Sequence, residues 1–185
     1  MVALTALAAL LWVLLAIGTA IRLTSPGPIL FRQRRTGLNG RVFAIYKFRT
    51  MSVIEDGDII VPAARNDARV TPLGSFLRRY ILDELPQVLN VLKGEMSFVG
   101  PRPHALAHDR HYGAQIPDYS RRFTVRPGLT GLAQVRGLRG EIHRLDGMAQ
   151  RIAADAEYAT RWSLGGDLMI LLRTVPLLLN RLNAY

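Results

Sequence analysis

The chain has 185 residues, of which 49% are hydrophobic and 21% are charged, a composition that fits a single folded domain and argues against disorder. It contains no cysteine, which excludes disulfides, thiolate metal sites and a cysteine nucleophile. The 24 lysines and arginines outnumber the 14 acidic residues, and the resulting net charge of +10 predicts anionic partners such as phosphate groups, nucleic acid or acidic lipids.

The first 21 residues are apolar apart from Thr5, Gly18 and Thr19, and none of them is charged. A run of this length is long enough to cross the hydrocarbon core of a bilayer as a helix. A secretory signal peptide fits poorly, because no basic residue precedes the run and no small-residue cleavage site follows it. Two alternatives remain: a spanning helix, and a re-entrant helix that enters the bilayer and turns back.

The sequence Ser25-Pro26-Gly27-Pro28 follows the apolar run and interrupts it. Both prolines lack a backbone donor and clash with the preceding helical turn. One interpretation is a plain helix stop at the membrane surface. The other is a sharp bend at membrane depth, where the Ser25 hydroxyl helps to satisfy the freed carbonyls. We predict the second arrangement, with residues 1–36 forming a re-entrant membrane segment of helix, break and second helix, in which the break falls at Ser25 and Pro26.

The charges that follow the break bear on orientation. After the bend, Ile29–Phe31 would return to the membrane surface, where three arginines meet lipid headgroups. These are Arg32, Arg34 and Arg35. A positive cluster directly after an apolar run favours a cytoplasmic position for the rest of the chain.

Residues 37–185 are expected to form one module, so that the fold class is mostly α with a small β element, attached to one face of a membrane. A strand is predicted over Arg41–Phe48, after a turn at Gly37–Gly40, because its apolar residues partly alternate. Helices are predicted over residues 72–93, 104–119 and 145–162, and loops over 55–68, 95–103 and 126–131.

The segment 168–182 is apolar almost throughout, with few polar interruptions. It is too short and too interrupted to span a bilayer comfortably. We predict an amphipathic helix in the membrane interface; a terminal core helix is the alternative.

The most informative pair in the sequence is Asp83-Glu84. On one continuous helix over 72–93, Glu84 falls beside an apolar stripe and Asp83 on its flank. A carboxylate beside a buried face is costly unless it is paired or binds a cation. Pro86 is expected to kink this helix next to the pair. The alternative is an ordinary salt bridge between Asp83 and Arg79, with Glu84 reaching water.

Basic residues surround this pair in the sequence. Arg78 and Arg79 lie one turn before it, Lys47 and Arg49 end the predicted strand, and Arg102 lies in the following loop. Carboxylates among guanidinium groups are typical of phosphoryl chemistry. No P-loop, dinucleotide-binding glycine motif or nucleophile elbow is present.

Two other kinds of site are not predicted. His104 and His108 stand four residues apart but lack the glutamate of a zinc-binding H-E-x-x-H motif, so a solvated helix face is expected. Nucleic acid is not an expected partner, because the arginines are scattered and no aromatic platform accompanies them.

Six motifs occur in the order typical of one family. They are Ser25–Pro28, Lys47–Met51, Leu82–Gln87, Val99–Pro103, Pro127–Val135 and Asp155–Leu164. The sequence therefore resembles the bacterial sugar transferases, which are monotopic polyprenyl-phosphate phosphoglycosyl transferases, over practically its whole length. Within that family it is most similar to undecaprenyl-phosphate glucose phosphotransferases of the colanic-acid type. Large members of that group carry further N-terminal membrane helices, so we expect this chain to correspond to the catalytic module.

The resemblance implies transfer of a sugar 1-phosphate from a UDP-sugar to undecaprenyl phosphate, with release of UMP. It implies that Asp83 is the nucleophile of a ping-pong reaction through a covalent phosphosugar intermediate, and that Glu84 holds Mg²⁺. A catalytically inactive scaffold is the alternative, and the intact acidic pair argues against it.

The resemblance also implies how the substrate phosphates are bound. Arg78 and Arg102 match positions that clamp phosphate oxygens. Lys47 and Arg49 are weaker candidates for the same role, with a structural role as the alternative.

Partners and location follow from the same resemblance. The expected partners are the UDP-sugar, undecaprenyl phosphate and membrane lipids, and the expected location is the cytoplasmic face of the bacterial inner membrane. The step would be the first membrane reaction of exopolysaccharide synthesis. Glucose is the favoured sugar and galactose the alternative; whether the enzyme works as a homodimer is left open.

Overall fold

The computed structural model of the chain describes residues 2–52, 67–138, 140 and 144–179. Helices dominate these ranges, as predicted, and the strands form two small sheets. The α-helices are α1 (Val2–Thr24), α2 (Pro72–Arg79), α3 (Val88–Leu92), α4 (Leu106–Gly113), α5 (Leu132–Val135), α6 (Leu145–Thr160) and α7 (Leu164–Leu179). The 3-10 helices are η1 (Leu38–Gly40), η2 (Leu82–Gln87) and η3 (Tyr119–Thr124), and the strands are β1 (Leu30–Thr36), β2 (Val42–Phe48), β3 (Ser97–Val99) and β4 (Gly128–Thr130). The predicted loop 55–68 lies almost wholly outside the described residues.

The apolar N-terminal run forms α1, which ends one residue before Ser25. Across the described ranges, we find no helix with the length and hydropathy that crossing a membrane would require. After α1 the chain reverses direction. The contacts show this, since Ile29 lies against Gly18 and belongs to the same hydrophobic cluster as Ile21. The same cluster contains Phe48 and Leu77, so it ties α1 to the body of the protein.

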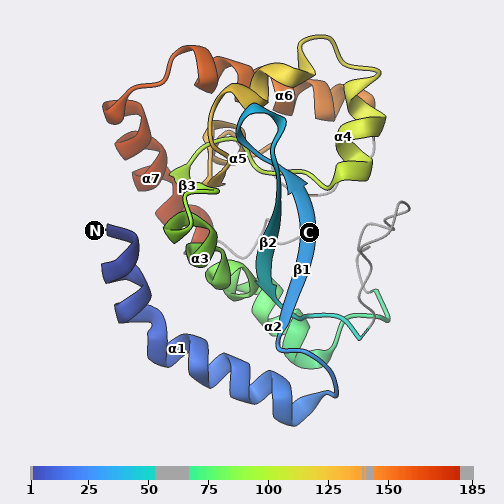
Figure 1. Cartoon of the computed structure of the whole chain (residues 1–185), viewed down its shortest axis with the longest axis vertical. Helices are drawn as coiled ribbons and strands as arrows, with labels where there is room; N and C mark the ends of the chain where they lie inside the picture. Colours follow the sequence, from blue (N-terminus) through green and yellow to red (C-terminus); the bar gives the residue numbers. More distant parts are fainter. Residues whose placement is uncertain (1, 53–66, 139, 141–143, 180–185) are drawn as a thin grey trace.

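A β-hairpin runs through the middle of the molecule, with α1 at one end and α4 and α6 at the other (Figure 1). Strands β1 and β2 pair antiparallel from Leu30↔Phe48 to Thr36↔Val42. The predicted strand and the turn before it are thus confirmed, and Asn39 takes a left-handed conformation in that turn. The second helix predicted after the break is wrong, because residues 30–36 form strand β1 instead. This strand has apolar residues only at the adjacent Leu30 and Phe31, so it lacks the alternation that marks a strand.

The edge of β2 that faces away from β1 forms hydrogen bonds with a side chain of α3. Asn90 in α3 is fully buried, and its amide nitrogen donates to the Ala44 carbonyl at 2.7 Å. The amide oxygen of Asn90 accepts from the Tyr46 backbone N–H at 3.1 Å. This contact fixes α3, and with it η2, against the strand.

The single helix predicted over 72–93 is wrong. Its start is as expected, since the Thr71 hydroxyl accepts from the Gly74 N–H at 2.9 Å, but the segment divides into α2, η2 and α3. The division falls at Ile81, which has φ 59° and ψ 18°, a conformation that is costly for a β-branched residue. Pro86, where a kink was predicted, instead lies inside η2. The helical wheel drawn for a continuous helix therefore does not describe the Asp83-Glu84 segment.

The loops predicted over 95–103 and 126–131 each contain a short strand. Strands β3 and β4 pair in parallel, and the Gly100 N–H donates to the Thr130 carbonyl at 2.9 Å. Both strands are only three residues long, too short for a periodic pattern. Gly128 allows the close approach, because a Cβ there would lie 2.1 Å from the Gly100 nitrogen.

The remaining helices follow the predictions in part. Residues 145–160 form α6 as expected, whereas the helix predicted over 104–119 shortens to α4 and is followed by η3. Helix α7 begins at Leu164, earlier than predicted, and residues 180–182 of the predicted segment lie outside the described residues. Ile170 packs on Val99 and Tyr158, so one face of α7 belongs to the core. The opposite face is exposed and apolar.

Candidate active site

The hairpin places Lys47 beside the acidic pair. Phe43 and Ile45 on β2 point into the core, and Lys47 follows them on the same face because strand side chains alternate. The Lys47 ammonium donates to Glu84 Oε1 at 3.0 Å, with the two side chains only 17% and 12% exposed. Burial lowers the pKa of Lys47, and the nearby Glu84 carboxylate opposes that shift.

Arg102 approaches the same carboxylate from the segment after β3. Its Nη1 donates to Glu84 Oε2 at 3.0 Å, and its Nη2 donates to Glu84 Oε1. This two-pronged contact raises the pKa of Arg102, so the guanidinium stays charged. Glu84 is therefore held between two cations, from β2 and from the segment after β3.

Asp83 differs sharply from its neighbour. Within the described part of the chain, its carboxylate makes no hydrogen bond and no ion pair. Burial raises the pKa of Asp83 from 3.8 to about 6, and the negative charge of Glu84 adds to the rise, whereas Lys47, Arg78 and Arg102 oppose it. The predicted alternative, a salt bridge between Asp83 and Arg79, is not formed. A half-buried carboxylate without a partner remains available to react.

The structure gives the two other predicted phosphate-binding arginines different positions. Arg78 lies close enough to Asp83 to lower the pKa of that carboxyl group, and its Nε donates to the Thr50 hydroxyl at 2.8 Å. Arg49 lies instead at the break after α1. Its Nη2 donates to the Ser25 carbonyl at 2.8 Å and to the Ser25 hydroxyl at 2.7 Å, and its Nη1 donates to the Pro26 carbonyl. Of the sequence-predicted residues, Lys47, Arg78, Asp83, Glu84 and Arg102 come together, and Ser25, Pro26 and Arg49 form a second group.

A buried polar network lies behind Arg102. The Nη2 group of Arg122 donates to the Arg102 carbonyl and lies 3.0 Å from Asp155 Oδ2, with both side chains of this ion pair 2% exposed. The Tyr119 hydroxyl donates to Asp109 Oδ1 at 2.7 Å and accepts from Arg122 Nη1 at 3.1 Å. The network connects η3, α4 and α6 to the backbone of a residue that holds Glu84.

Sequence reasoning missed this network. The available signal was the position of Asp155, which falls on the buried face of α6 at helical spacing from Met148 and Ile152. No comparable pattern pointed to Arg122. The prediction of a solvated face for His104 is wrong: the ring is buried, and its Nδ1 lies 2.9 Å from the Tyr119 hydroxyl. Burial and the nearby Arg122 charge lower the pKa of His104 well below 6.5, so the ring is neutral.

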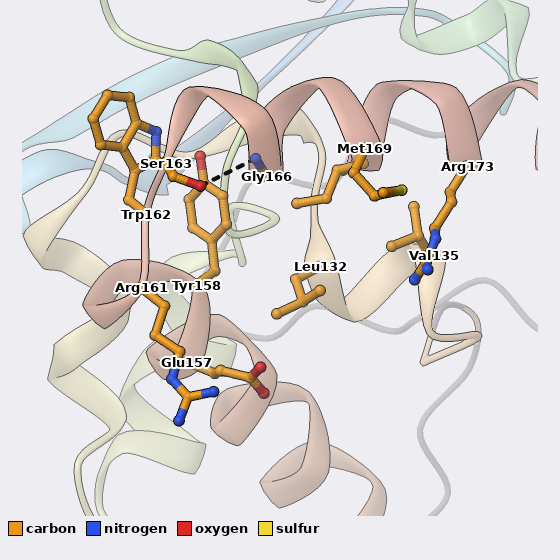
Figure 2. A pocket seen from close by; sticks show the side chains of 11 residues that line it. Leu132, Val135, Glu157, Tyr158, Arg161, Trp162, Ser163, Gly166, Met169 and Arg173 are labelled. Carbon is orange, nitrogen blue, oxygen red and sulfur yellow. Dashed lines mark hydrogen bonds between the residues drawn. The ribbon is translucent and has the colours of Figure 1, made fainter.

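A pocket of about 180 Å³ lies apart from this site, between α5, α6 and α7 (Figure 2). Its wall is mainly apolar, with Leu132, Val135 and Met169 among the lining residues, and Arg161 and Arg173 are also part of its lining. None of the sequence-predicted site residues lines it. The pocket therefore lies outside the group of residues that the sequence predicted.

The acidic pair can be tested for its fit to Mg²⁺. This ion prefers hard oxygen donors and is commonly held by one or two carboxylates together with substrate phosphates. Asp83 and Glu84 supply such donors. The Asp83 carboxylate is free of competing bonds within the described residues, whereas an ion on Glu84 would share its oxygens with Lys47 and Arg102. No group of three or more histidine or acidic side chains in the described ranges could form a metal site. The donor set therefore fits an ion that substrate phosphates help to hold.

A carboxylate pair enclosed by guanidinium and ammonium groups defines a site for phosphate-group chemistry. In a comparison with known families, the bacterial sugar transferase family matches residues 1–181, so the chain belongs to this family.

Three relatives show what the chain is similar to. It is 59% identical to a UDP-glucose:undecaprenyl-phosphate glucose-1-phosphate transferase of Caulobacter vibrioides, over 98% of this chain and 67% of the relative. It is 49% identical to a protein of the same name from Escherichia coli K12, over 88% of this chain and 35% of the relative. An exopolysaccharide production protein of Rhizobium leguminosarum is 45% identical over 93% of this chain and 88% of the relative. The chain thus spans about two thirds of the Caulobacter protein and about a third of the E. coli protein.

Proposed function

We propose that this protein transfers glucose 1-phosphate from UDP-glucose to undecaprenyl phosphate and releases UMP. The observation that carries the proposal is the contrast between Glu84, held by two cations, and Asp83, which has no partner in the described structure. The names of the Caulobacter and E. coli relatives support the choice of sugar and of lipid. The name of the Rhizobium relative supports a role in exopolysaccharide synthesis, as its first membrane step.

The reaction would proceed in two displacements. The Asp83 carboxylate attacks the β-phosphorus of UDP-glucose, the bond from that phosphorus to the bridging oxygen breaks, and UMP leaves. The phosphate of undecaprenyl phosphate then attacks the same phosphorus and releases the Asp83 carboxylate. One site serves both steps, because each substrate only has to present a phosphate in line with Asp83.

The cationic side chains would stabilise the charge that develops on the transferred phosphate. Lys47 and Arg102 form ion pairs with Glu84, and Arg78 lies near Asp83. A phosphorus atom attacked by Asp83 would therefore lie close to all three cations. Mg²⁺, held by Glu84 together with substrate phosphates, would neutralise diphosphate oxygens when bound. Glu84→Gln should therefore lower turnover by orders of magnitude, and EDTA should abolish it.

We propose that the protein lies at the cytoplasmic face of the membrane, because the acceptor lipid of this reaction lies in the bilayer. Helix α1 exposes Trp12 and Leu23, and α7 exposes Leu164, Leu168 and Leu172. We propose that α1 enters the bilayer as a re-entrant segment and that the exposed apolar face of α7 lies in the interface. Replacing Leu168 and Leu172 by glutamate should weaken vesicle binding, and unchanged binding would contradict the role of α7.

The test is a burst experiment on purified protein in detergent, free of the acceptor lipid. UDP-glucose alone should release about one equivalent of UMP per enzyme before any lipid is added, because the covalent step comes first. Asp83→Asn should remove burst and turnover together, whereas Asp146→Asn, at an exposed residue of α6, should change neither. Lipid-dependent turnover with no UMP and no phosphosugar on Asp83 in the absence of lipid would contradict the covalent route. UDP-galactose in place of UDP-glucose tests the alternative sugar.

A further inference from the structure

Arg49 closes the end of α1. Its side chain is 5% exposed, and it donates to the carbonyl and the hydroxyl of Ser25 and to the carbonyl of Pro26. Carbonyls at the end of a helix have no intrahelical partner and carry partial negative charge. Pro26 and Pro28 cannot supply backbone donors to them. The buried Arg49 guanidinium therefore satisfies the two carbonyls that directly follow α1.

The backbone around Arg49 is shaped for this contact. Gly27 has φ 115°, and a Cβ at Gly27 would lie 2.1 Å from Arg49 Nη1. The guanidinium thus occupies space that only glycine leaves open. The Arg49 N–H also donates to the Ile29 carbonyl at 2.9 Å, which joins the chain just after the break to the end of β2.

Arg49 also connects the break to the active site. It stands two residues after Lys47, and Phe48 between them packs against Ile21 of α1. The end of β2 therefore fixes both the position of α1, through Phe48 and Arg49, and the position of Lys47 beside Glu84.

We propose that Arg49 is a positioning residue that holds the turn of α1 and so sets its re-entrant topology, and that it does not bind substrate phosphate. The proposal rests on the membrane placement of α1 proposed above. The planar fork of arginine is needed, because Nη1 and Nη2 each reach a different carbonyl. A lysine offers one ammonium centre and can restore only part of the contact.

The test measures topology directly, since the chain has no native cysteine. A Val2→Cys reporter in intact spheroplasts should be protected from a membrane-impermeant maleimide and should react after lysis. Adding Arg49→Met should raise labelling from outside by about tenfold, the shift expected when a charge-assisted hydrogen bond is lost. Arg49→Lys should give an intermediate value. Arg41→Met, at an exposed arginine just before the same strand, is the matched control and should leave the reporter protected.

A second variant disrupts the contact between Arg49 and the segment after α1 by changing Gly27 instead of Arg49. Gly27→Ala should expose the reporter as Arg49→Met does, because the added methyl group displaces Nη1. Gly40→Ala is its control, since Gly40 also has a positive φ but has no atom within 4 Å of an added Cβ.

The outcomes separate this proposal from the one on which it rests. A protected reporter in both Arg49→Met and Gly27→Ala overturns the role of Arg49 and leaves the re-entrant placement standing. Labelling from outside in the reporter protein with Arg49 intact overturns the re-entrant placement itself. Increased labelling in both variants, with both controls protected, supports the proposal.

Discussion

Asp83 and Glu84 are adjacent in the chain, yet only Glu84 is bound by cations. Glu84 accepts from Lys47 and Arg102, whereas Asp83 has no bonded partner in the described structure. The short helix η2, entered through the left-handed Ile81, turns the two carboxylates toward different surroundings. One carboxylate is suited to a structural or metal-holding role and the other to attack.

The raised pKa of Asp83, about 6, predicts the pH dependence of the first step. The nucleophile must be deprotonated, so UMP release in a single turnover should fall as pH drops through about 6. Rapid quenching at a series of pH values measures it. Glu157→Gln, which removes an exposed carboxylate that pairs with Arg136, should leave the profile unchanged. A rate that stays flat well below pH 6 would contradict the assignment of Asp83.

The same pKa predicts that Asp83→Asn stabilises the protein. The pKa of this carboxyl group is higher in the folded state than its ordinary 3.8, so the folded state binds more protons between about pH 4 and 6. The stability of the native protein therefore falls as pH rises through that window, by about 1–2 kcal/mol for a half-buried group. Thermal melting should show a higher Tm for Asp83→Asn at neutral pH and no difference near pH 4. A lower Tm at neutral pH would mean that Asp83 has a stabilising partner.

Arg102→Lys tests whether the positive charge at this position is sufficient for activity or whether the two-pronged contact with Glu84 is also needed. A lysine keeps the positive charge but cannot reach both oxygens of Glu84, so turnover should fall by about 100-fold, as when an oriented electrostatic donor is removed. Steady-state kinetics measure the loss. The exposed Arg144 provides the control, and Arg144→Lys should behave as the native enzyme does. Full activity in Arg102→Lys would show that charge alone is sufficient.

The buried Arg122–Asp155 pair predicts a large loss of stability when one partner is removed. Asp155→Asn removes the nearer counter-charge of the Arg122 guanidinium and leaves only Asp109, at 3.8 Å, at a site where Arg122 is 2% exposed, a change that costs about 3 kcal/mol. Chemical denaturation of the detergent-solubilised protein measures it. Replacing both residues by apolar ones of similar size should cost less than Asp155→Asn alone. A double variant that is no more stable than the single one would show that other members of the network dominate.

Two glycines predict opposite effects of the same substitution. Gly147→Ala lies within α6 where nothing is within 4 Å of the added methyl group, so it should raise stability by about 0.5–1 kcal/mol. Gly128→Ala would place the methyl group 2.1 Å from the Gly100 nitrogen and force β3 and β4 apart. Tm values of the two variants should move in opposite directions. Equal shifts would contradict the close approach of the strands.

The sequence predicted the parts of this protein that have a local signature. The apolar run of α1, the alternation in β2 and the Thr71 cap are such signatures, and the acidic pair stood out by its position beside apolar residues. What failed depends on contacts between distant segments. The interruption of the helix at Ile81 involves no glycine or proline at that position, so the sequence does not indicate it. The pairing of β3 with β4 and the contact of Arg122 with the Arg102 carbonyl join residues 20 or more positions apart.

The bond between Asn90 and β2 has a further consequence. A two-stranded hairpin leaves a row of unpaired backbone groups on each outer edge, and such an edge can recruit a strand from another molecule. Asn90 occupies this edge of β2, since its amide takes both the Ala44 carbonyl and the Tyr46 N–H. The hairpin thus cannot add a foreign strand at that place without first expelling a fully buried side chain. The helix that carries Asn90 therefore protects the β2 edge of the hairpin from pairing with a strand of another molecule.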